Sequence, residues 1–111
     1  MIGKFDIKQN YMAMTLLGTE YLDKFKKKHT IASEQIDCWV SDIEGSTFKI
    51  PQDIKKKYSS ASFLKNNIVI FNIKGRDYRL EVKIAYQMGK IKIMWVGTHQ
   101  EYDKRNKDRN S

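Results

Sequence analysis

The chain has very little of what disulfides and metal sites are built from. Its 111 residues include one cysteine and two histidines, which excludes an internal disulfide and leaves no Cys/His cluster with the spacing of a zinc site. No apolar run approaches the roughly 20 residues that span a bilayer, and the first residues lack the apolar core of a signal peptide. We therefore expect a cytoplasmic protein with no membrane partner, whose chemistry needs neither a metal nor another cofactor.

What the chain does have is enough apolar side chain for one core, and an excess of positive charge. Hydrophobic residues make up 41% and aromatic residues 12%, which suits a single domain over residues 1–111. The net charge is +8; residues 64–111 hold 11 basic and 5 acidic side chains, and residues 1–63 hold 10 and 8. A basic half favours a polyanionic partner, nucleic acid before membrane. The alternative is that the excess lysine only keeps the protein soluble.

Hydrophobic periodicity predicts two helices in the first half of the chain. The first spans residues 19–29 with Thr19 as its cap, and its apolar stripe consists of Tyr21, Leu22 and Phe25. The second is capped by Thr30 or Ser33, and its core face follows the i, i+3, i+4, i+7 spacing of Ile36, Trp39, Val40 and Ile43.

The segments around these helices are less regular. Residues 1–11 show no clear period and are a possible extension of the domain, and residues 12–17 can form a short strand ended by Gly18. After the second helix, Pro51 is well placed to begin a single helical turn that reaches Tyr58.

The last third of the chain alternates between apolar and polar residues, as expected for a meander of three strands at 68–74, 78–86 and 90–96. The alternation also predicts a register. Val82 lies opposite Trp95 if the second turn is Met88-Gly89, and Phe71 lies opposite Val82 if the first turn is Arg76-Asp77. The core face would then consist of Leu80, Val82, Ile84, Ile91, Ile93 and Trp95.

The other face of this meander is predicted to stay open, and it carries Lys74, Arg79, Glu81, Lys83 and Lys92. Continued to its end, the register sets Arg79 opposite Thr98. Thr98 and Glu101 have the Thr-x-x-Glu spacing of a capping box, which predicts a terminal helix with His99 as its first residue. Tyr102, three residues further on, would share a face with His99 beside the positive end of the helix dipole.

Arg79, His99 and Tyr102 are the candidate catalytic residues. Phosphodiester cleavage without a metal requires a group that moves a proton and a fixed cation for the pentacovalent phosphorane. His99 and Tyr102 would share proton transfer, and Arg79 would stabilise the phosphorane. Two alternatives stay open: Tyr102 packs onto the sheet while His99 is solvated, or Arg79 forms a salt bridge with Glu101 or Asp103.

Three segments carry a family pattern: Val69-Ile70-Phe71-Asn72-Ile73-Lys74-Gly75, Tyr78-Arg79-Leu80, and Val96-Gly97-Thr98-His99-Gln100-Glu101-Tyr102-Asp103-Lys104. Together they resemble the HigB-type toxins of bacterial toxin–antitoxin systems, within the RelE-like superfamily. The resemblance runs from about Thr19 to Lys107 and leaves residues 1–11 outside. It implies an α+β fold with two N-terminal helices on an antiparallel sheet and a short C-terminal helix. It also implies an mRNA endoribonuclease that acts at the ribosome and is silenced by a cognate helix-turn-helix antitoxin.

One position departs from the family pattern, which has Gly-Asn before the Tyr-Arg-Leu strand where this chain has Gly75 and Arg76. Because arginine tolerates the left-handed conformation poorly, either the loop is longer than two residues or Arg76 is strained, and it can instead gain an RNA contact. The expected RNA-binding residues are Lys74, Arg76, Lys83, Lys92 and Lys104. The rival function is a non-catalytic RNA- or protein-binding module that uses the basic face of the sheet.

Overall fold

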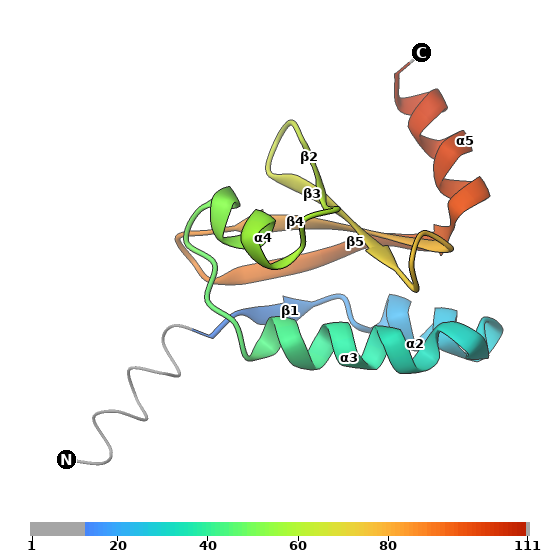
Figure 1. Cartoon of the computed structure of the whole chain (residues 1–111), viewed down its shortest axis with the longest axis horizontal. Helices are drawn as coiled ribbons and strands as arrows, with labels where there is room; N and C mark the ends of the chain where they lie inside the picture. Colours follow the sequence, from blue (N-terminus) through green and yellow to red (C-terminus); the bar gives the residue numbers. More distant parts are fainter. Residues whose placement is uncertain (1–12, 111) are drawn as a thin grey trace.

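The computed structural model describes residues 13–110, which form an α+β fold around one five-stranded sheet (Figure 1). The elements in chain order are β1 (Thr15–Leu17), α2 (Glu20–Lys28), the 3-10 turn η1 (Thr30–Ala32), α3 (Ser33–Glu44), α4 (Pro51–Lys57), β2 (Ser62–Leu64), β3 (Ile68–Ile73), β4 (Tyr78–Ala85), β5 (Lys90–Thr98) and α5 (His99–Arg109). The predicted fold class is confirmed. The predicted extension over residues 1–11 lies outside the described residues. None of the helices in residues 13–110 has the length and hydropathy needed to cross a membrane.

The strands follow the order β1-β5-β4-β3-β2. Strands β3, β4 and β5 pair antiparallel, as predicted, and β2 adds a further antiparallel pair. Strand β1 lies parallel to β5, so the sheet is mixed. Strand β1 begins at Thr15, later than the predicted start, and gives way to Gly18, whose φ of 81° glycine adopts readily. Strand β2 was not predicted, because its three residues are too few to show a period.

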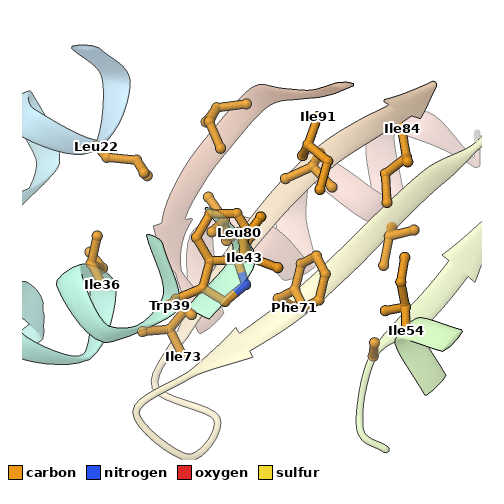
Figure 2. Close-up of a cluster of buried hydrophobic side chains, with 14 of the residues drawn as sticks. Leu22, Ile36, Trp39, Ile43, Ile54, Phe71, Ile73, Leu80, Ile84 and Ile91 are labelled. Carbon is orange, nitrogen blue, oxygen red and sulfur yellow. The ribbon is translucent and has the colours of Figure 1, made fainter. Parts of the chain in front are cut away.

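Helices α2, α3 and α4 pack on one face of the sheet, and the hydrophobic core lies between these helices and that face (Figure 2). Helix α3 buries Ile36, Trp39 and Ile43, and Val40 packs against the same cluster, which confirms the predicted core face. Phe71 on β3 meets the ring of Trp39 edge-on at a centroid distance of 5.3 Å. We call this side of the sheet the core face and the opposite side the outer face.

Thr19 is the N-cap residue of α2, as predicted, but its side chain accepts no capping hydrogen bond. The predicted cap of α3 by Thr30 or Ser33 is wrong: the N-cap residue is Ala32, and Thr30 begins the 3-10 turn that leads into α3. Tyr21 is 50% exposed, because only Leu22 and Phe25 of α2 reach the core. Tertiary packing therefore fixes where these two helices begin, and local capping chemistry does not.

Helix α4 begins at Pro51 as predicted and is tied to α3 by a polar contact. The Tyr58 hydroxyl donates a hydrogen bond to the Asp42 carboxylate, and Lys57 Nζ lies 2.7 Å from the same carboxylate. Hydrogen bonds from Lys57 and Tyr58 lower the pKa of Asp42, while burial raises the pKa of Tyr58. The network keeps α4 against the core.

Both predicted hairpin registers are wrong by two residues next to their turns, although the predicted core face is right except at Trp95. Phe71 pairs with Leu80, and Ile84 pairs with Ile91, because each turn has four residues where two were predicted. A shift of two residues keeps every side chain on its predicted face. The first turn, residues 74–77, puts positive φ on Lys74 and Gly75, so the longer-loop alternative is correct and Arg76 is not strained.

A β-bulge at Met94 reverses the alternation at the end of β5. Val82 pairs with Ile93 but its neighbour Glu81 pairs with Trp95, so Met94 has no partner of its own. Trp95 therefore lies on the outer face with Glu81, and the prediction that Trp95 is in the core is wrong. The bulge places a large aromatic ring on the side of the sheet that carries α5.

The α3 core face sets a first prediction. Ile43→Ala should lower the free energy of unfolding by about 2–5 kcal/mol, because Ile43 is fully buried and its loss leaves a cavity. Ile31→Ala is the matched control: Ile31 is 70% exposed, and its change should stay within about 0.5 kcal/mol. Urea unfolding measures both. Equal effects of the two substitutions would contradict the core described here.

Candidate active site

The predicted capping box joins β5 to α5. Thr98 Oγ1 accepts a hydrogen bond from the Glu101 backbone N–H at 3.2 Å, and Glu101 accepts one from the Thr98 N–H at 2.8 Å. The hydrogen bond from the Thr98 backbone is the main cause that lowers the pKa of Glu101. His99 is the first residue of α5, and its backbone N–H donates to the Asp77 carbonyl at 2.9 Å. The capping box and the bond to Asp77 therefore both hold the His99 backbone, from which the imidazole projects.

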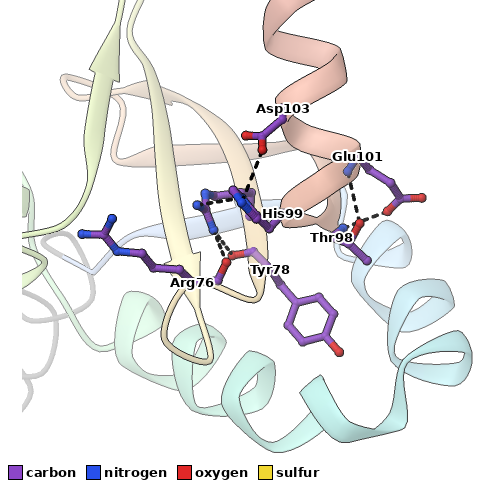
Figure 3. Close-up of polar contacts among 7 residues, drawn as sticks. Arg76, Tyr78, Thr98, His99, Glu101 and Asp103 are labelled. Atoms are coloured by element: carbon purple, nitrogen blue, oxygen red, sulfur yellow. Dashed lines mark hydrogen bonds and ion pairs between the residues drawn. The ribbon is translucent and has the colours of Figure 1, made fainter.

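His99 lies between an arginine and a carboxylate (Figure 3). An Arg79 terminal nitrogen is 3.2 Å from His99 Nδ1, and Asp103 Oδ2 is 3.3 Å from His99 Nε2. Arg79 also donates to the carbonyl of Arg76, which holds its guanidinium beside the first turn. Arg79 pairs with Gly97, one residue from the predicted Thr98, yet its contact with the start of α5 forms as predicted.

This arrangement favours one tautomer of a neutral imidazole. A guanidinium only donates hydrogen bonds, so Nδ1 must accept from Arg79 and carries no proton. The ring proton is then on Nε2, which faces Asp103. Asp103 was considered in the sequence only as a salt-bridge partner of Arg79; its i, i+4 spacing from His99 was the signal for this contact.

Tyr102 lies on the same helix but contacts a different residue. Its ring centroid is 6.0 Å from that of Trp95, with the planes at 50°. Within residues 13–110 its hydroxyl makes no hydrogen bond. The structure therefore brings Arg79 and His99 together and sets the Tyr102 ring against the outer face of the sheet.

A family model matches residues 32–105, about two-thirds of the chain, and it describes the HigB toxin, the RelE-like toxic component of a toxin–antitoxin system. The chain belongs to the HigB toxin family. Comparison with curated proteins gives no match. The matched segment contains every candidate site residue but starts after α2, so it is shorter than the resemblance described above. Membership implies that this toxin has an antitoxin partner.

Four of the five cations predicted to bind RNA lie in two places on the toxin. Lys83 and Lys92 are exposed and directly opposite each other on the outer face of β4 and β5. Two like charges in this position destabilise a sheet, so stability does not explain the pair. Lys74 and Arg76 lie in the turn beside Arg79, with Lys74 Nζ 3.4 Å from Asp77.

The fifth predicted cation, Lys104, is on α5. It lines a cleft between α5 and the end of β5, together with Trp95 and Arg105. Among residues 13–110, no group of three or more His, Cys, Asp and Glu side chains is arranged to hold a metal ion. The other histidine of the toxin, His29, stacks on Phe25 at a centroid distance of 4.4 Å and meets the Tyr78 ring at 5.7 Å.

The close approach of Trp95 to Gly97 gives a second prediction. A Cβ on Gly97 would lie 2.5 and 2.6 Å from two ring atoms of Trp95, so Gly97→Ala must displace the ring that α5 packs on. We expect a loss of roughly 1–3 kcal/mol in unfolding free energy and an altered near-ultraviolet circular dichroism spectrum. In the matched control Gly45→Ala, the nearest atom would be 3.5 Å away, and no such change is expected. A Gly97→Ala protein with the wild-type spectrum and stability would contradict this packing.

Proposed function

We propose that this toxin is an endoribonuclease that cleaves mRNA on the ribosome and is neutralised by a helix-turn-helix antitoxin. The observation that carries the proposal is the pair Arg79 and His99, 3.2 Å apart at the head of α5. The exposed cations Lys83 and Lys92 lie roughly 13 Å along the sheet from Arg79, at about 3.3 Å per residue, and would hold neighbouring phosphates. The family description supports the toxin role and an antitoxin partner.

In the proposed reaction the ribose 2′-oxygen attacks the adjacent phosphorus. His99 Nδ1 takes the 2′-hydroxyl proton, the new P–O2′ bond forms, and the P–O5′ bond breaks, leaving a cyclic phosphate and a 5′-hydroxyl. Asp103 stabilises the imidazolium through Nε2–H, as a carboxylate does in other acid–base sites. Tyr102, one turn along the helix, gives a proton to the departing 5′-oxygen. No step calls for a metal ion.

Arg79 has two roles in this reaction. In the free toxin its guanidinium contacts Nδ1, the nitrogen that must accept the proton. A phosphate attracts a guanidinium more strongly than a neutral imidazole does, because the hydrogen bond is charge-assisted. The arriving phosphate would therefore draw Arg79 onto the reacting oxygens and free Nδ1 at the same time.

The third prediction separates catalysis from binding. Arg79→Ala should lower the cleavage rate on the order of 10²–10³, because it removes the cation that stabilises the phosphorane, and should change RNA affinity less. Lys92→Ala should mainly weaken RNA binding, since Lys92 is exposed and lies along the sheet from Arg79 and His99. Lys65→Ala, which removes an exposed charge from the β2–β3 turn, controls for net charge. Cleavage of ribosome-bound mRNA and filter binding measure the two quantities. A pure affinity loss in Arg79→Ala would argue against the proposed role.

The fourth prediction tests the proton-transfer groups. His99→Gln keeps a hydrogen-bonding side chain but does not titrate near neutral pH, so little cleavage should remain. Tyr102→Phe keeps the ring on Trp95 and removes only the hydroxyl, so the fold should survive while cleavage falls. Circular dichroism and ribosome co-sedimentation check folding and binding. If both variants fold, bind ribosomes and cut mRNA at wild-type levels, the non-catalytic binding module is the better description.

A further inference from the structure

Helix α5 is attached to the sheet differently from the other helices. It has no buried residue, whereas α2, α3 and α4 each bury apolar side chains in the core. Its contacts with the outer face are aromatic and ionic: Tyr102 lies against Trp95, and the Arg105 guanidinium is 5.2 Å from the Trp95 ring centroid. Apolar burial therefore supplies little of what keeps α5 in place.

The ionic contact centres on Glu81, the one buried acidic side chain within residues 13–110, at 2% exposure. Arg105 binds its carboxylate through two nitrogens, at 3.1 and 3.3 Å. Arg109, one turn further along α5, also donates to Glu81. Burial by itself would raise the pKa of Glu81, but hydrogen bonds and charge from the two arginines outweigh it and the pKa is lowered. The carboxylate thus stays ionised under α5.

The two arginines are committed to this carboxylate. Removing the partners of a buried charge is strongly destabilising, because the charge is left in the protein interior without compensation. If Arg105 and Arg109 turned to an RNA phosphate, Glu81 would be left buried and unpaired. Their place on a basic face therefore does not make them RNA-binding residues, in contrast to the exposed Lys83 and Lys92.

Strand β4 and helix α5 are joined at two places. Arg79 contacts His99 in the first turn of α5, and Glu81, two residues along the same face of β4, contacts Arg105 and Arg109 in the last turns. One contact leaves a helix free to pivot about it. Two contacts about two to three turns apart fix its direction. The direction of α5 sets where the His99 ring lies.

We propose that Glu81, Arg105 and Arg109 are positioning residues that hold α5 on the outer face and thereby keep His99 against Arg79. That this positioning supports catalysis rests on the proposed function. That the three residues hold α5 and His99 in place does not, and it can be observed without RNA.

The test uses full-length Glu81→Gln and Arg109→Gln. Amide hydrogen exchange in residues 103–109 should become at least about tenfold faster, because the helix opens more often, while exchange in β3 and β4 stays near wild type. Nitrogen NMR of the His99 ring should move from a single neutral tautomer toward a mixture, as contact with Arg79 is lost. If Glu81→Gln does not fold, Arg109→Gln still tests the proposal, because Arg109 is an exposed residue at the C-terminal end of α5.

Two control variants match these substitutions. Lys107→Gln removes the same charge from an exposed position on α5, and Glu44→Gln removes an exposed acid from the end of α3; both should exchange like wild type. Wild-type exchange and His99 signals in Glu81→Gln and Arg109→Gln would overturn the proposal. So would equal acceleration in Lys107→Gln, which would make the effect one of net charge.

Cleavage assays then test the catalytic link. Arg109→Gln should lower kcat with little change in KM, and Arg109→Lys should recover part of the loss, because the ammonium restores one ion pair. Normal kcat in a variant with a loosened α5 would overturn the positioning role. If the wild-type toxin cleaves no RNA, the proposed function fails, and hydrogen exchange and NMR still decide whether the network holds His99.

Discussion

The extra residue at Met94 is the constraint on which the outer face depends. Without the bulge, alternation would place Trp95 in the core and a smaller side chain on the outside. With it, the indole lies beside Glu81 and over Gly97, so α5 packs on an aromatic ring and pairs its arginines with a carboxylate. One backbone irregularity therefore provides the platform for the helix that carries His99.

The two faces of the sheet follow different physical rules. On the core face, burial of α3 and the central strands against one another supplies the stability of the fold, as expected for a domain of this size. On the outer face, charges decide the structure: some are neutralised in pairs, as at Glu81, and some are left exposed, as at Lys83 and Lys92.

Sequence reasoning succeeded where a local signal carried the information. The capping box at Thr98 and Glu101 and the 3.6-residue period of α3 are complete within a few residues, and the structure reproduces both. It failed where the deciding contact is long-range. No local pattern shows that Met94 is an extra residue, or that Glu81 is buried by arginines more than twenty positions away. The predicted contact of Arg79 with the start of α5 is confirmed even though the register is wrong. The two-residue error at the turn and the one-residue shift at the bulge leave Arg79 on its predicted face, one residue from its predicted partner Thr98.

The hydrogen bond from the His99 backbone to the Asp77 carbonyl has a consequence for how this protein can change over evolution. Surface turns usually accept insertions and deletions freely. The β3–β4 turn at residues 74–77 is an exception, because one of its carbonyls is part of the support under the terminal helix. The β4–β5 turn at residues 86–89, at the opposite end of β4, is likewise tied to the fold, because the Gly89 carbonyl accepts a hydrogen bond from the Thr15 backbone N–H in β1. Length variation among relatives should therefore be rare in both turns.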